Sequence, residues 1–181
     1  MVRKEEYDRI IDELKECEKV SFKLENGSGL SMLENKNVFM IRSVREETFR
    51  QILSKLNKQA PNCKLCILGR AGDGEILKQE FPHDYRLFEV HDDKQYDVAG
   101  IGGILDEIRA VNFNACLFMT KESISFSQVN LMEILYKLPC SMKGVVTKHC
   151  KVNLLQTEWE RYIRIKADYD MLCDEIWKMY D

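Results

Sequence analysis

The chain has 181 residues, of which 45% are hydrophobic, and this is enough to build one domain around a single core. Its 27 basic and 30 acidic residues are spread evenly and leave a net charge of −3, so no broad field favours nucleic acid or anionic lipid. No apolar run approaches the roughly 20 residues of a membrane span, and the start lacks the apolar core of a signal peptide, so we expect a cytoplasmic protein that binds neither membrane nor nucleic acid.

The first 36 residues predict a helix and a short connection. In residues 1–20 the apolar side chains share one face of an amphipathic helix: Tyr7, Ile10, Ile11, Leu14 and Cys17. Residues 21–36 alternate apolar and polar positions around Asn26-Gly27, which favours a β-hairpin. Their Gly and Ser content also fits a flexible connector that lets the first helix reach the domain or a neighbouring subunit.

Five short apolar runs, each followed by helical periodicity, fill residues 37–155. They are Val38–Ile41, Leu65–Leu68, Leu87–Val90, Ala115–Met119 and Met142–Val146. Strands that alternate with helices imply a parallel sheet covered on both faces. We therefore predict one α/β domain over residues 1–181, with a doubly wound, mainly parallel five-stranded sheet of Rossmann-like or flavodoxin-like type and an amphipathic helix at each terminus.

The helices of this region carry recognisable start signals. Ser43 and Glu46 have the spacing of a capping box, and so do Ser125 and Gln128. The periodicity from Ile101 to Val111 predicts one helix between the third and fourth strands.

Residues 157–181 predict a long final helix. It is rich in aromatic residues, namely Trp159, Tyr162, Tyr169, Trp177 and Tyr180. This stripe favours packing against the sheet or the first helix, and a self-association face is the second reading.

Seven cysteines fit a reducing compartment, because their number is odd and their spacing irregular. The pair in Cys63-Lys-Leu-Cys66 enters a predicted strand, whereas a redox pair needs its first thiol at a helix N-terminus. No second pair of Cys or His residues has the spacing of a zinc site. We therefore expect buried free thiols and neither a metal nor another cofactor.

Ligands of such sheets bind beyond the carboxyl ends of the strands, where the strand order reverses. This reversal usually lies beside the first strand, which would bring residues 42–45 next to residues 120–123. Helix N-termini at the same edge favour an anion. We therefore predict ligand binding by the basic, hydroxyl and glycine residues of this edge: Arg42, Ser43, Arg45, Gly69, Arg70, Thr120, Lys121 and Ser123.

Plainer readings of these residues stay open. Helix capping explains Ser43, Asp73 and Ser125, and the glycines from Gly69 to Gly74 match neither the dinucleotide fingerprint nor the P-loop. His91, followed by two aspartates, fits a solvated loop as well as a cation or acid/base site. No nucleophile motif is recognisable, so the catalytic residues are unknown.

Part of the chain has the pattern of an apolar strand ending in Ile-Arg, a helix and a second strand. The segments that carry it are Val38-Phe-Met-Ile-Arg42, Phe49-Arg-Gln-Ile-Leu53, Ala60-Pro61, Lys64-Leu-Cys-Ile-Leu-Gly69 and Ile104–Phe118. Residues 37–147 thereby resemble the N-terminal, acceptor-side domain of heptosyltransferase-type two-domain glycosyltransferases. The resemblance implies the acceptor-side half alone. The Gly-Asp pair that supplies the family's catalytic carboxylate is replaced by Ser43-Val-Arg-Glu-Glu47, which puts transfer activity in doubt.

The sequence thus predicts a domain that binds a small anionic ligand, a sugar or nucleotide phosphate, without clear catalytic machinery. The alternative is a non-catalytic interaction protein that forms a homodimer through its terminal helices. A small enzyme with an unidentified acid/base pair is the third reading.

Overall fold

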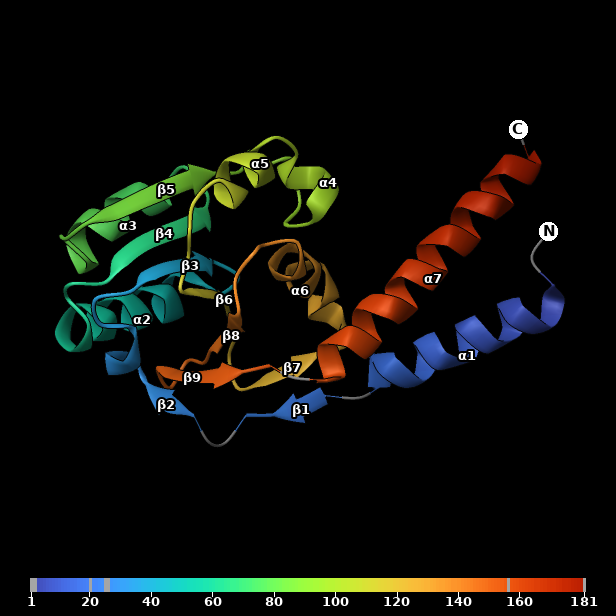
Figure 1. Cartoon of the computed structure of the whole chain (residues 1–181), viewed down its shortest axis with the longest axis horizontal. Coiled ribbons are helices and arrows are strands. Elements are labelled where there is room, and N and C mark those ends of the chain that lie inside the picture. The colour runs from blue at the N-terminus through green and yellow to red at the C-terminus, as the bar shows by residue number, and fades with distance from the viewer. Residues whose placement is uncertain (1–2, 20, 25–26, 156, 181) are drawn as a thin grey trace.

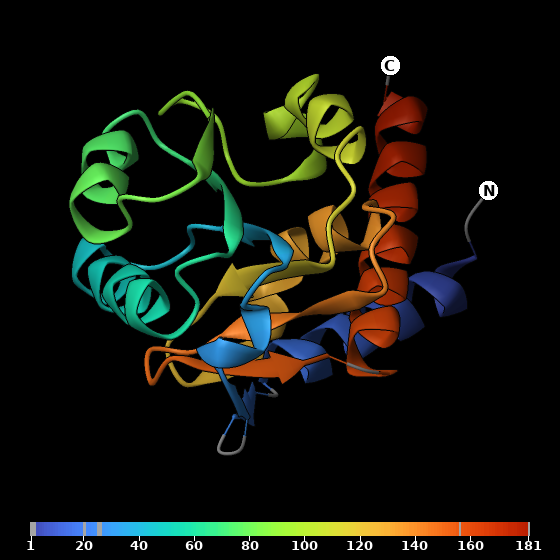
Figure 2. The ribbon, with the colours of Figure 1, turned by 60° about the vertical axis from the view of Figure 1, so that its left-hand side comes forward.

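The computed structural model describes residues 3–19, 21–24, 27–155 and 157–180. They form an α/β fold with a mixed seven-stranded sheet and a separate two-stranded one (Figures 1 and 2). The strands are β1 (Ser21–Lys23), β2 (Ser28–Gly29), β3 (Asn37–Ile41), β4 (Lys64–Gly69), β5 (Tyr85–Glu89), β6 (Ala115–Met119), β7 (Ser123–Ser125), β8 (Met142–Val146) and β9 (Lys151–Leu154). The helices are α1 (Lys4–Lys19), α2 (Glu46–Gln59), α3 (Asp73–Glu80), α4 (Val98–Ile101), α5 (Ile104–Arg109), α6 (Val129–Tyr136) and α7 (Thr157–Tyr180), with short 3₁₀ turns η1 (Leu30–Leu33) and η2 (Phe126–Gln128).

The large sheet has the order β2-β9-β8-β6-β3-β4-β5. The predicted apolar runs lie in β3, β4, β5, β6 and β8, which pair in parallel. The α/β class is confirmed, whereas the predicted five-stranded sheet is incomplete. Two short strands extend it: β9 pairs with β8 in antiparallel orientation, and β2 pairs with β9 in antiparallel orientation. They are too short and too polar to stand out as hydrophobic runs.

Alternate residues of the central strands point to opposite faces of the sheet. Phe39 and Ile41 belong to a core shared with α4, α5, α6 and α7. Val38 and Met40 belong to a second core shared with η1, α2 and α3. All five side chains of β6 are buried, as expected of a strand that is covered on both faces.

The hairpin expected over residues 21–36 is wrong. β1 pairs with β7, and β2 pairs with β9, so the two halves bind different partners (Figure 1). Asn26, the expected turn residue, lies outside the described residues. The alternation of apolar and polar residues predicts strands in this segment, but it does not predict that their partners are the distant strands β7 and β9.

The single helix expected from Ile101 to Val111 is divided into α4 and α5. Gly102 lies between them with a φ of 51°, a conformation that ends a right-handed helix. The apolar periodicity continues across this break because both short helices face the same core.

The two terminal helices extend from the body as an arm, defined here as α1 and α7. They run side by side, and both termini lie at the far end (Figure 1). The base of α7 is fixed on the body, where Tyr162 packs edge-on against Phe126 at 5.6 Å and Lys166 pairs with Glu133 at 3.1 Å. The side chains of Trp159 and Tyr180 lie outside the described part. No helix within the described residues is long and apolar enough to cross a membrane.

Candidate functional site

A large cleft lies where the strand order reverses. From β3 the chain continues to β4 and β5 on one side, whereas β6 and β8 lie on the other. The segments after β3 and β6 therefore meet, and a cleft of about 790 Å³ forms between them. This volume is typical of small-molecule sites.

We call this cleft the cationic cleft, because all the charged residues of its described lining are basic. Its charged members are Arg42, Arg45, Arg70 and Lys121. No carboxylate is among the described lining residues, although the whole chain has a net charge of −3. The arrangement therefore favours an anion locally, although the chain as a whole is slightly acidic.

Arg42 is anchored beside a buried carboxylate. Its Nε lies 3.7 Å from Oδ1 of Asp73, whose side chain is 5% exposed, and its guanidinium lies 5.6 Å from the ring centre of Phe49. The Arg42 side chain forms no hydrogen bond with the described residues, and its Nε is fully buried. Arg42 thus keeps hydrogen-bond donors that a ligand can use, on a side chain that packing already positions.

The side chain of Arg70 already forms hydrogen bonds within the protein. Its guanidinium donates to the carbonyl oxygens of Val90 (3.3 Å), His91 and Lys94 (2.8 Å). It also lies 4.4 Å from the ring centre of Tyr96. These contacts hold the loop of residues 91–97 against the end of β4, so the structure gives Arg70 a positioning role in addition to its place in the lining.

Arg45 and Lys121 are exposed, and their side chains form no hydrogen bond or ion pair with the described residues. Arg45 is also the N-cap of α2, and no side chain caps this helix. Uncapped N–H groups and the helix dipole add positive potential beside the two cations.

The capping box expected between Ser43 and Glu46 is wrong. The Ser43 hydroxyl instead donates to the carbonyl oxygens of Met119 (2.5 Å) and Ile41 (3.3 Å). It thereby ties the end of β3 to the end of β6, at the floor of the cationic cleft.

The second capping box is confirmed and supports the opposite wall. Gln128 accepts a hydrogen bond from the Ser125 N–H at 3.0 Å and donates to the Thr120 hydroxyl at 2.8 Å. That hydroxyl donates in turn to the carbonyl of Ser123. Thr120 and Ser123 therefore line the cleft while their groups stabilise its wall.

Gly69 is the one predicted site residue that is not in the lining. A Cβ there would lie 2.5 Å from Oδ2 of Asp73, which accepts a hydrogen bond from the Arg70 N–H at 2.8 Å. The glycine therefore makes room for the buried carboxylate that pairs with Arg42. Its effect on the cleft is indirect.

Sequence reasoning missed several neutral lining residues: Gln95, Tyr96, Ser127 and Asn130. Burial raises the pKa of the Tyr96 hydroxyl. The loop after β5 was recognisable as part of this edge, but the sequence drew attention to His91 and its neighbouring aspartates. The hydroxyl and amide residues after Lys121 carried no motif that marked them as lining.

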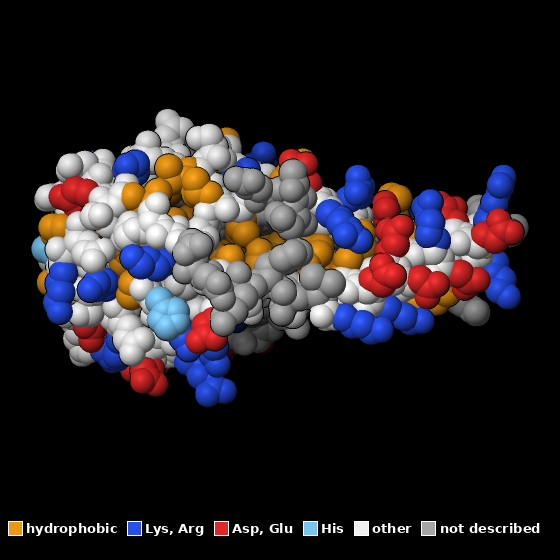
Figure 3. All heavy atoms as spheres, turned by 90° about the horizontal axis from the view of Figure 1, so that it is seen from below, with side chains coloured by type: hydrophobic (Ala, Val, Ile, Leu, Met, Phe, Trp, Pro, Cys, Tyr) orange, Lys and Arg blue, Asp and Glu red, His pale blue; other side chains and the backbone are white. Residues whose placement is uncertain are grey.

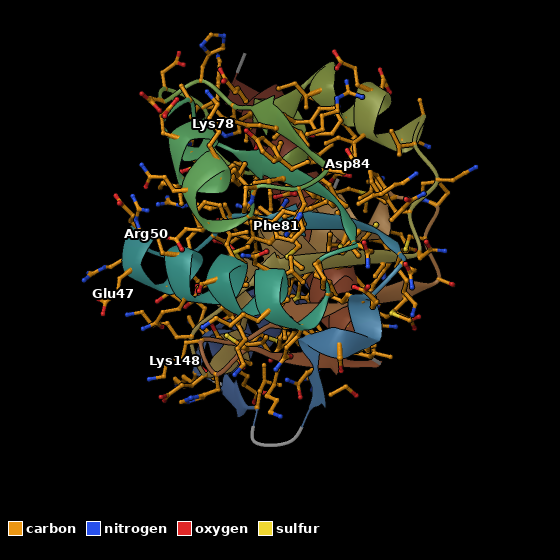
Figure 4. All side chains as sticks on the ribbon, turned by 90° about the vertical axis from the view of Figure 1, so that its left-hand side faces the viewer. Glu47, Arg50, Lys78, Phe81, Asp84 and Lys148 are labelled. Atoms are coloured by element: carbon orange, nitrogen blue, oxygen red, sulfur yellow. The ribbon has the colours of Figure 1, made fainter. Side chains whose placement is uncertain are left out.

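A second groove of about 480 Å³ lies beside α2, and its basic and acidic lining residues are Arg50, Lys55, Lys58, Glu80, Lys148 and His149. In Figure 4 the labelled residues Arg50 and Lys148 lie on the left of the view, whereas Asp84, which precedes β5, lies on the right. Its cations are partly neutralised, because Arg50 pairs with Glu46 (2.9 Å) and Glu80 (3.1 Å) and Lys148 pairs with Glu122. The described lining of the cationic cleft holds no carboxylate, whereas Glu80 lines the second groove, and this difference favours the cationic cleft as the anion site.

The Cys63 and Cys66 pair has the wrong electrostatics for redox exchange. Burial raises the pKa of the Cys63 thiol to about 12 and also raises the pKa of Cys66. A reactive pair needs a lowered pKa, because the thiolate is the nucleophile.

No family model, curated protein or solved structure matches this chain.

Proposed function

We propose that this protein binds a small anionic ligand, a sugar or nucleotide phosphate, in the cationic cleft. The observation that carries the proposal is the charge of the lining: four cations and no carboxylate among its described residues, in a chain of net negative charge. Arg42, Arg45 and Lys121 supply the donors for the anion, and the first turn of α2 adds backbone N–H groups.

We further infer a Rossmann-like winding for the parallel strands, which the order β5-β4-β3-β6-β8 supports. A ligand at the reversal beside β3 agrees with this winding. Kinship with the acceptor-side domain of heptosyltransferase-type glycosyltransferases stays a prediction. We propose a binding role rather than catalysis, because the described lining residues include no carboxylate or histidine to act as an acid/base group.

A thermal-shift panel of inorganic phosphate, hexose phosphates and AMP tests the proposal. A ligand at 100 times its Kd adds about 2.7 kcal/mol to the free energy of unfolding, so at least one member should raise the Tm clearly. Arg45→Ala and Lys121→Ala should each weaken that ligand about ten-fold, because each removes a charge-assisted contact without disturbing the fold.

Lys64→Ala is the matched control, because this exposed lysine begins β4 at the opposite edge of the sheet. It should leave binding unchanged. Absence of a shift across the whole panel would refute the proposal. A shift that both cleft variants leave intact would refute the location.

A second candidate function is self-association through the arm. Tyr7 and Ile11 on α1, and Tyr169, Cys173 and Trp177 on α7, recur at spacings of four residues and so share helical faces. A hydrogen bond to Cys173 raises the pKa of Tyr169, and Tyr7 contributes to the same shift, so the two stripes adjoin. Trp177 is 70% exposed and Tyr7 is 39% exposed.

We propose that a second copy of the chain binds the face formed by these residues of α1 and α7, called here the aromatic face. Neighbouring charges are already paired within each helix, as between Lys166 and Asp170 (2.5 Å) and between Lys15 and Asp12 (3.8 Å). Charges of both signs alternate along the arm (Figure 3). Two arms can therefore approach without strong repulsion and pack as a four-helix bundle.

Light scattering after size exclusion tests this second candidate. The chain should elute as a dimer, and Trp177→Ser should shift it toward the monomer. Met171→Ser is the matched control, because this residue is 63% exposed but lies on the opposite side of α7. A monomeric wild-type chain, or equal effects of both variants, would refute the dimer.

A further inference from the structure

Uncharged hydrogen-bonding groups line the part of the cationic cleft that the cations do not. This part, called here the neutral wall, consists of Gln95, Ser125, Ser127 and Asn130. The side-chain amides of Gln95 and Asn130 form no hydrogen bond with the described residues. The hydroxyls of Ser125 and Ser127 lie 2.6 Å apart and bond to each other. The neutral wall therefore offers both donors and acceptors to a ligand.

An aromatic platform for a nucleobase is missing from the described lining. Tyr96 is its only aromatic member, and the guanidinium of Arg70 already stacks on that ring at 4.4 Å. The remaining apolar members, Val44 and Leu131, are 8% and 9% exposed. Nucleobases that proteins bind outside a duplex usually stack on aromatic rings or on Arg guanidinium planes, and the described lining has no aromatic ring free of such a contact.

The size of the cleft also argues against inorganic phosphate as the whole ligand. A volume of about 790 Å³ leaves most of the space unfilled when an anion occupies the cationic part. A carbohydrate suits the remaining space, because its hydroxyl groups both donate and accept hydrogen bonds, as the amides and hydroxyls of the neutral wall do.

We propose that the ligand of the cationic cleft is a phosphorylated sugar. Its phosphate binds Arg42, Arg45 and Lys121, and its hydroxyl groups bind the amides of Gln95 and Asn130. This inference rests on the proposed function, because it identifies the class of anion that the same cleft binds.

Calorimetric titration of the full chain separates the two proposals. The probes are the 1- and 6-phosphates of glucose, mannose and galactose, the free hexoses, inorganic phosphate and AMP. At least one hexose phosphate should bind ten-fold more tightly than inorganic phosphate and AMP, and the free hexoses should bind more weakly still.

Two variants give a finer test. Gln95→Ala and Asn130→Ala should each weaken the best hexose phosphate roughly five-fold, which is the effect of one neutral hydrogen bond, and should leave inorganic phosphate unchanged. Gln79→Ala removes an exposed amide on α3, outside the cleft, and should change neither affinity.

The outcomes are distinguishable. If phosphate, AMP and all hexose phosphates bind equally, or if AMP binds best, the sugar inference is wrong although the proposed function stands. If no probe binds, the proposed function fails and the inference fails with it. If Gln95→Ala and Asn130→Ala weaken phosphate and hexose phosphate equally, the neutral wall does not recognise the sugar.

Discussion

Replacing Arg70 with alanine should destabilise the loop that borders the cleft. The variant loses three hydrogen bonds from the guanidinium to the carbonyl oxygens of Val90, His91 and Lys94, together with the stacking on Tyr96. Two of the bonds are worth about 1 kcal/mol each, the longer bond to Val90 about 0.5 kcal/mol and the stacking roughly 0.5–1 kcal/mol. The expected loss in the free energy of unfolding is about 3 kcal/mol.

Urea denaturation of the wild type, Arg70→Ala and Arg70→Lys measures this loss. Lysine keeps the charge but cannot reach three carbonyl groups at once, so Arg70→Lys should recover only a minor part. Hydrogen exchange should show faster exchange across residues 91–97 in both variants. A loss below about 1 kcal/mol for Arg70→Ala, or full recovery by lysine, would refute the argument that the geometry of the guanidinium holds this loop.

Three further predictions concern stability. Gly69→Ala should cost about 1–3 kcal/mol by urea denaturation, because the new Cβ would lie 2.5 Å from Asp73 Oδ2; a neutral result would mean that the carboxylate moves freely. Ser125→Ala should cost about 1 kcal/mol through the lost capping box, and an unchanged midpoint would contradict this role. Burial raises the pKa of Cys63 from 9.0 to about 12, so the buried thiol stabilises the fold below pH 9 and this contribution is lost as the pH rises toward 12. Between pH 8 and pH 10 the wild type should lose about 1 kcal/mol more than Cys63→Ala, and parallel pH profiles would contradict the assignment.

The sequence predicts the central strands well because burial on both faces enforces continuous apolar runs. Ala115–Met119 is the clearest case, since the whole of β6 is buried. The short strands β2 and β7 pair with distant parts of the chain, and no local signal encodes a distant partner. Gly102 shows the same limit, because apolar periodicity continues across the helix break that its positive φ creates.

The residues of the candidate site also divide into those that the sequence predicts and those that it does not. Arg42, Arg45 and Lys121 were found because they directly follow strands whose carboxyl ends meet in a parallel sheet. The hydrogen bonds from Arg70 to the loop of residues 91–97 depend on the path of that loop, and no sequence periodicity predicts this path. The free amides of Gln95 and Asn130 were missed for the same reason, since each depends on how a loop or helix turns toward the cleft.

An ¹H–¹⁵N NMR titration of the full chain with inorganic phosphate tests the central claim most directly, because it locates an anion without assuming its identity. The cationic cleft predicts the largest shifts at the backbone amides of Glu46, Glu47 and Lys121, at the start of α2 and beyond β6. Largest shifts at Lys148 and His149, in the second groove, would contradict the account. So would a spectrum that phosphate leaves unchanged.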